Sequence, residues 1–148
     1  MERKTSDASG TAPALLCGAA GGALPLVWAV ICGCLGYVIA GYFLFWAIAV
    51  LVFLLLKSST VRQAVTKSVT AGAVYITELI LLLKTGIVQW VFSVLCSDYA
   101  AEYGSMSPGH SFGITMFFYP ASFMMLAAVI FLSVTRASEK QHDMEEKQ

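Results

Sequence analysis

The chain has 148 residues, of which 58% are hydrophobic and only 12% are charged, and its formal net charge at pH 7 is zero. A soluble domain carries about 25% charged residues, about twice the share found here. In addition, no charged residue occurs from Ala8 to Leu56. A water-soluble globule cannot bury so long an uncharged run, but a lipid bilayer accommodates it. The composition therefore excludes a soluble enzyme, a nucleic-acid-binding protein and a disordered tail, and it indicates an integral membrane protein.

Charge divides the chain into a polar N-terminal segment (1–13), an apolar region (14–135) and a charged C-terminal tail (136–148). Backbone groups inside a bilayer must be hydrogen-bonded within the protein, so continuous apolar runs of this length predict helices. We therefore expect an all-α fold, a polytopic integral membrane helical bundle between two cytoplasmic segments.

The first apolar block, 14–56, is about twice as long as one membrane-spanning helix, which needs about 20 residues. It predicts either a hairpin of two spans, 14–33 and 37–56, or a single long span behind a leader of small residues. In the hairpin the reversal falls between Gly33 and Gly36, because glycine adopts the backbone conformations that a tight turn needs.

The basic segment 57–68 separates this block from the next one. It predicts a short loop or an interfacial helix that attracts anionic lipid headgroups. The two remaining apolar blocks are long enough for one helix each, at 69–95 and 113–134, and an acidic outer loop lies between them.

The distribution of basic residues favours four spans over three. With four spans, every Lys and Arg except Lys84 lies on one side of the membrane, because the N-terminal segment, the 57–68 segment and the tail share that side. With three spans, Arg3 and Lys4 would lie opposite the rest. We therefore predict four transmembrane helices with both termini in the cytoplasm.

The helix expected at 69–95 carries Glu78 and Lys84, and an ionisable residue at membrane depth is a functional hypothesis by default. On a helical wheel Tyr75, Glu78, Thr85 and Gln89 share one stripe, with Lys84 on the next face. One interpretation is a structural stripe of interhelical hydrogen bonds, with the lysine reaching the interface. The other is a proton or ion path, or a charge that docks on a partner.

Small residues in the first expected span predict a helix-packing surface. Gly18 and Gly22 form a GxxxG pattern, which lets two helices approach closely, either within the chain or in a dimer. Cys17 lies beside them near the cytoplasmic face and is a candidate for S-palmitoylation.

Cysteine and histidine positions give the remaining candidate sites. Cys32 and Cys34 fall at the outer tip of the hairpin, and Cys96 opens the outer loop. Two alternatives follow: Cys96 forms a disulfide with one of the other two, or all three are free, buried thiols. His110 and His142 fall on opposite sides of the membrane, and the chain contains no CxxC motif. We therefore expect neither a metal site nor a cofactor.

No catalytic set accompanies these features, so we expect a non-enzymatic scaffold or accessory subunit of a membrane assembly. Its partners are then the lipid bilayer and other membrane proteins, or a second copy, bound through helix–helix contacts. Nucleic acid is not expected as a partner. The alternative is a small transporter or channel component that uses Glu78 and Lys84.

The expected topology has four spans, inward termini, a short second connection at 57–68 and an aromatic-rich fourth span that contains Phe117, Phe118 and Phe123. In this topology the chain resembles the MARVEL-type vesicle-trafficking proteins. The resemblance implies a role in membrane trafficking or membrane organisation.

Overall fold

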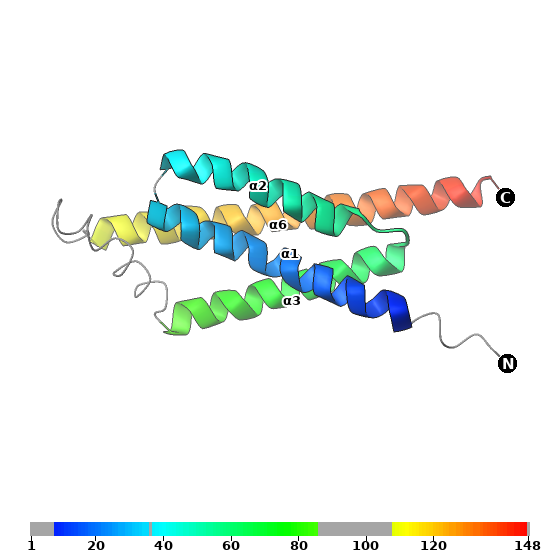
Figure 1. Cartoon of the computed structure of the whole chain (residues 1–148), viewed down its shortest axis with the longest axis horizontal. Coiled ribbons are helices and arrows are strands. Elements are labelled where there is room, and N and C mark those ends of the chain that lie inside the picture. The colour runs from blue at the N-terminus through cyan, green and yellow to red at the C-terminus, as the bar shows by residue number, and fades with distance from the viewer. Residues whose placement is uncertain (1–7, 36, 86–107, 148) are drawn as a thin grey trace.

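The computed structural model describes residues 8–35, 37–85 and 108–147, and this part of the chain forms α-helices and no β-strand. The helices are α1 (Ala8–Leu35), α2 (Tyr37–Leu56), α3 (Val61–Thr85) and α6 (Pro108–Glu145). Helices α1 and α3 run in one direction along the bundle, and α2 and α6 run in the other (Figure 1). The all-α prediction is confirmed for the described residues.

Three helices are long and apolar enough to cross a membrane, at Gly10–Ile31, Val61–Thr85 and Tyr119–Glu145. Helix α2 contributes a shorter apolar stretch, Tyr42–Leu56. The described chain is therefore a helical bundle with the character of a membrane protein.

Segment 57–68 is a short connection followed by helix. Residues 57–60 connect α2 to α3, and residues 61–68 form the first two turns of α3. The carbonyl oxygen of Thr60 accepts the Ala64 amide at 3.1 Å, and its Oγ1 accepts the Gln63 amide at 3.3 Å. Because such capping satisfies amides that lack partners at a helix N-terminus, the helix starts earlier than the apolar block.

Helix α6 continues beyond the predicted span 113–134. It begins at Pro108, whose fixed backbone angle suits a first helical turn. It ends at Glu145, so part of the charged tail extends the same helix past the rest of the bundle (Figure 1). Within this extension, Gln141 donates a hydrogen bond to Glu145 at 3.2 Å.

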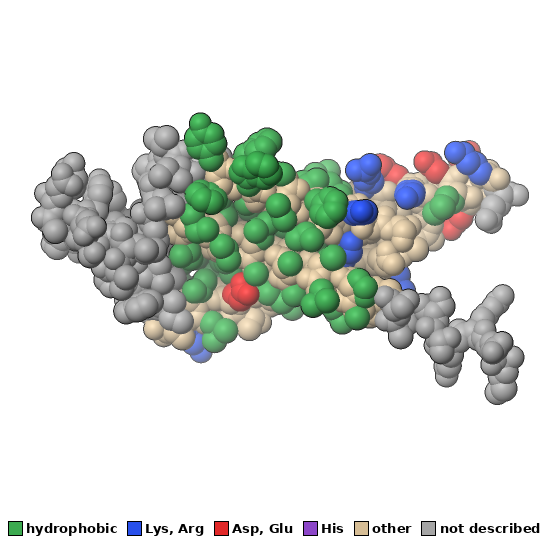
Figure 2. Space-filling view, viewed as in Figure 1, with side chains coloured by type: hydrophobic (Ala, Val, Ile, Leu, Met, Phe, Trp, Pro, Cys, Tyr) green, Lys and Arg blue, Asp and Glu red, His purple; other side chains and the backbone are tan. Residues whose placement is uncertain are grey.

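All four helices contribute side chains to the apolar core. Its buried residues are Leu26, Leu51, Leu55, Ala71, Tyr75, Leu126 and Val129. Large apolar side chains also cover the outside of the bundle (Figure 2), among them Trp46 and Phe131, which are 65% and 71% exposed. An outer surface of this kind suits contact with lipid.

Charged side chains gather at one end of the bundle, where α2 ends, α3 begins and α6 extends (Figures 1 and 2). On the extension of α6, basic and acidic side chains lie side by side (Figure 2). Helix α1 begins at this same end (Figure 1). Lys84, in the last turn of α3, lies at the opposite end. We call the end at which α1 begins the basic end of the bundle, because residues 57–68 carry three basic residues and no acidic one. The extension of α6 adds Arg136 and Lys140 and also three acidic residues, Glu139, Asp143 and Glu145.

Candidate functional site

Two glycines of α1 allow α3 to approach closely. A Cβ atom at Gly18 would lie 2.7 Å from the Lys67 carbonyl oxygen and 2.8 Å from Thr70 Cβ. A Cβ atom at Gly22 would collide with the Ala71 carbonyl oxygen. The structure therefore places the GxxxG pattern in a contact within the chain, between two helices that run in the same direction.

Lys67 is buried next to this contact and caps the C-terminus of α2. Its Nζ donates hydrogen bonds to the carbonyl oxygens of Leu54 at 3.0 Å and Lys57 at 2.7 Å. The last carbonyls of a helix have no partner within it, and a cation there also interacts favourably with the helix dipole. Ser133 of α6 donates to the Leu55 carbonyl oxygen at 2.7 Å, so α3 and α6 both hold the end of α2.

Tyr75, the first member of the predicted polar stripe, joins α3 to α6. Its hydroxyl oxygen lies 2.7 Å from Ser122 Oγ. Both hydroxyl groups lie within hydrogen-bonding distance of the Tyr119 carbonyl oxygen, at 3.2 and 2.8 Å. This residue therefore makes an interhelical hydrogen bond inside the bundle.

Glu78, about one turn further along α3, lies in a groove between α1 and α3. We call this the Glu78 groove; it has a volume of about 430 Å³, and its other lining residues are all apolar: Ala23, Leu26, Val27, Val30, Ile31, Leu81 and Leu82. Glu78 is partly buried, and no described residue forms a hydrogen bond or ion pair with its carboxylate. The carboxylate can accept a hydrogen bond or bind a cation, but the described part of the chain supplies neither.

The remaining members of the predicted stripe do not join Glu78. Thr85 is exposed and donates its hydroxyl group to a carbonyl oxygen of its own helix at 2.6 Å. Lys84 is exposed in the last turn of α3 and does not line the Glu78 groove. Gln89 lies outside the described residues.

The predicted cysteine sites are described in part. Cys17 is a free, partly buried thiol on α1. The predictions for Cys32, Cys34, Cys96 and His110 concern side chains outside the part of the chain that is described. Among the described side chains, no group of three or more His, Cys, Asp and Glu residues could hold a metal ion.

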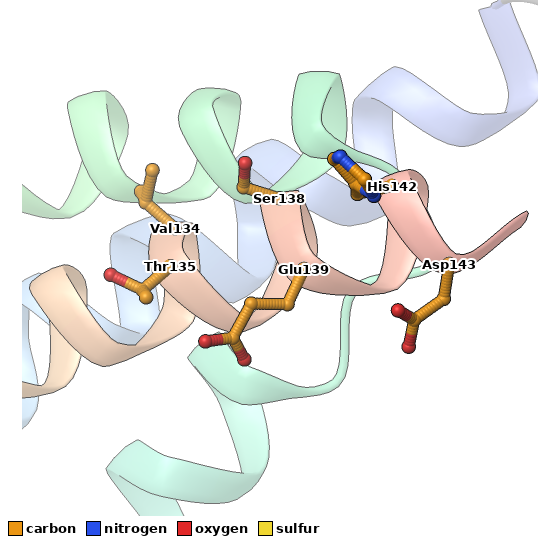
Figure 3. A pocket seen from close by; sticks show the side chains of 6 residues that line it. All are labelled: Val134, Thr135, Ser138, Glu139, His142 and Asp143. Carbon is orange, nitrogen blue, oxygen red and sulfur yellow. The ribbon is translucent and has the colours of Figure 1, made fainter. Parts of the chain in front are cut away.

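Another depression lies on the extension of α6 (Figure 3). All of its lining side chains come from this helix: Val134, Thr135, Ser138, Glu139, His142 and Asp143. A surface formed by one helix does not enclose a ligand as a binding cleft does. In the described chain no hydrogen bond joins Ser138 to His142, although a serine nucleophile and its general base would need one.

Three polar residues, Lys67, Ser122 and Ser133, form interhelical hydrogen bonds that are not predicted from the sequence. The two serines stand in an apolar block, where a hydroxyl group often bonds to a neighbouring helix. They are also three helical turns apart, which places them on one face of α6. That spacing is a signal from which the contact of α6 with α2 and α3 could have been predicted.

No family model matches the chain, and neither the curated proteins nor the solved structures include a significant match.

Proposed function

We propose that this protein is a non-enzymatic four-span membrane protein that acts as a scaffold or accessory subunit, and that a transmembrane helix of a partner protein docks in the Glu78 groove. The observation that carries this proposal is a carboxylate without a partner among the described residues, in an otherwise apolar groove. An ionised side chain at the bilayer centre costs about 2.5–3.5 kcal/mol on insertion scales. A partner helix that donates a hydrogen bond to Glu78 would reduce that cost.

The shape of the Glu78 groove supports the same partner. Val27 on one wall and Leu81 on the other are 51% and 53% exposed, so the groove opens toward the surroundings of the bundle. Helices in lipid associate through close packing and interhelical hydrogen bonds rather than through the hydrophobic effect. The groove offers a surface for the packing and one acceptor for the hydrogen bond.

The proposal includes four spans with both termini in the cytoplasm. Helix α2 has 20 residues and is therefore about 30 Å long, which matches the hydrocarbon core of a bilayer. The basic end of the bundle would face the cytoplasm under the positive-inside rule. Protease digestion of sealed vesicles should leave tags at the two termini equally accessible, whereas protection of one tag would establish an odd number of spans.

Membrane trafficking or membrane organisation of the MARVEL type is one form of this role, and the proposed topology supports it. The alternative, a small transporter or channel component, would use Glu78 and Lys84 directly. These two residues do not line a common groove, which favours the scaffold.

Photo-crosslinking in intact membranes tests the docking of a partner. A photoreactive amino acid at Val27 should form an adduct of one defined mass with the partner helix. Glu78→Leu should weaken assembly by about 1–2 kcal/mol, so the yield of this adduct should fall. Glu78→Gln keeps the shape and the hydrogen-bonding capacity, so the adduct should persist.

The control places the same photoreactive amino acid at Trp46, which is exposed on α2 and does not line the groove. It should not give the adduct seen from Val27. If Glu78→Leu leaves the Val27 adduct unchanged, the carboxylate has no part in docking. If Glu78→Gln abolishes an ion or proton flux while the adduct persists, the transporter alternative replaces the scaffold.

A further inference from the structure

A second groove lies at the basic end of the bundle, between the end of α2 and the extension of α6. We call it the basic groove; it has a volume of about 750 Å³, and its lining includes the uncharged polar residues Ser58, Ser59 and Gln63. Cationic side chains and apolar side chains both contribute, namely Lys57, Arg136 and Lys140 together with Val52, Phe53 and Leu56.

The three cations of the basic groove come from two elements. Arg136 and Lys140 are four residues apart and therefore share one face of α6. Lys57 comes from the α2–α3 connection, and its Nζ lies 5.1 Å from the centre of the Phe53 ring. Glu139 lines the separate depression of Figure 3, and no ion pair with a described carboxylate neutralises any of the three cations. Their charge is therefore available to a ligand.

The basic groove lies at the boundary between the apolar and the charged surface of the bundle. Its apolar wall is the end of α2, and Lys57 follows directly after that wall in the chain. Figure 2 shows basic side chains bordering the apolar surface at this end. In a membrane, this is the depth at which the headgroup of a phospholipid meets its acyl chains.

We propose that the basic groove binds an anionic phospholipid whose headgroup carries more than one negative charge. Its phosphate groups contact Lys57, Arg136 and Lys140, and an acyl chain lies against Phe53 and Leu56. Three cations that form no ion pair with a described carboxylate complement a polyanionic headgroup better than a singly charged or zwitterionic one. Basic pockets beside transmembrane helices on the cytoplasmic side have the chemistry that such headgroups need. This lipid site is separate from the Glu78 groove and does not depend on it.

Titration of the full chain in detergent micelles tests the proposal. Short-chain phosphatidylinositol bisphosphate, phosphatidylserine and phosphatidylcholine should bind with affinities that decrease in that order, as measured by native mass spectrometry. Inorganic phosphate should bind more weakly than the bisphosphate lipid because it has no acyl chain to lie on α2. Each cation near a membrane surface accounts for about a fivefold change in affinity. The double variant Arg136→Gln with Lys140→Gln should therefore lower the affinity for the bisphosphate lipid about 25-fold.

The matched control is Arg62→Gln with Lys147→Gln, which removes the same charge from residues that do not line the groove. It should change the affinity for the bisphosphate lipid by less than fivefold. Lys57→Gln changes a residue on a different element and should lower the affinity for the bisphosphate lipid about fivefold. Such a loss would show that the effect belongs to the groove rather than to the fold of α6. Equal losses in the two double variants, or equal affinity for inorganic phosphate and for the lipid, would overturn the proposal.

Discussion

Lys67 and Glu78 lie on the same helix, but only the charged group of Lys67 forms hydrogen bonds with described residues of the chain. Lys67 is buried, and its ammonium group donates hydrogen bonds to two carbonyl oxygens at the end of α2. Glu78, three turns further along α3, lies in an apolar groove in which no described residue donates to its carboxylate. The first charge is satisfied within the chain, and the second is available to another molecule.

The difference follows from what each side chain faces. The end of a helix presents carbonyl oxygens without partners, which a lysine can satisfy. The middle of a helix presents no free backbone group, so a carboxylate that faces it needs a donor from a side chain. The position of a charge along the neighbouring helix, and not its residue type alone, therefore separates a structural role from a binding role.

The largest loss of stability is expected for Lys67→Met, which keeps the length of the side chain but removes both hydrogen bonds. Hydrogen bonds to charged groups are each worth about 1.5–3 kcal/mol, so the free energy of unfolding should fall by about 3 kcal/mol. Unfolding of the purified protein in mixed micelles, followed by circular dichroism, measures the change.

The control for this variant is Lys57→Met, because the Lys57 side chain is exposed and lies over the Phe53 ring. This variant should lower the free energy of unfolding by less than about 1 kcal/mol. Equal losses for the two variants would mean that the cap on α2 does not stabilise the fold, and the contrast with Glu78 would disappear.

A smaller loss is expected for Gly22→Ala, which tests the contact that positions both charges. The new Cβ atom would meet the backbone oxygen of Ala71 and lie 3.0 Å from Val74 Cβ, so α1 and α3 must separate. Overpacking of this kind costs about 1–3 kcal/mol, and the same unfolding assay measures it.

Gly72→Ala provides the matched control on α3, because no atom lies within 4 Å of the added Cβ. It should stabilise the helix by about 0.5–1 kcal/mol, since alanine has a higher helix propensity than glycine. If both glycine variants stabilise the protein, the close approach of α1 to α3 does not exist.

Much of the helical architecture could be predicted because it depends on local patterns. The absence of charge from Ala8 to Leu56 predicts an apolar block, and the glycines at 33 and 36 predict a reversal between them. The first helix is longer than the predicted range 14–33, because α1 begins at Ala8 and continues through Gly33 to Leu35. The described helix α2 coincides with the predicted range 37–56. The one-turn spacing of Gly18 and Gly22 predicts a helix-packing surface directly from the sequence.

The sequence predicts too late a start for α3, because charged residues mark the boundary of the apolar block and α3 begins before that boundary, at Val61. Lys67 lies in the basic segment, and its side chain reaches back to the carbonyl oxygens of Leu54 in α2 and of Lys57 directly after it. A better signal was present, since Thr60 followed three residues later by Gln63 fits the sequence of a helix N-terminus. The Glu78 groove could not be predicted, because spacing along α3 does not say which residues of α1 lie opposite.

The smallest effect on stability is expected for Glu78→Leu in the isolated chain. No described hydrogen bond is lost, and leucine suits an apolar groove, so the free energy of unfolding should change by no more than about 0.5 kcal/mol. The same substitution should weaken assembly with the partner by about 1–2 kcal/mol, because the partner would lose its acceptor. A variant that leaves the monomer intact and impairs only the complex identifies a side chain that acts between molecules. If Glu78→Leu instead destabilises the isolated chain as much as Lys67→Met does, then Glu78 is held within the chain after all, and the two charges of α3 have the same structural role.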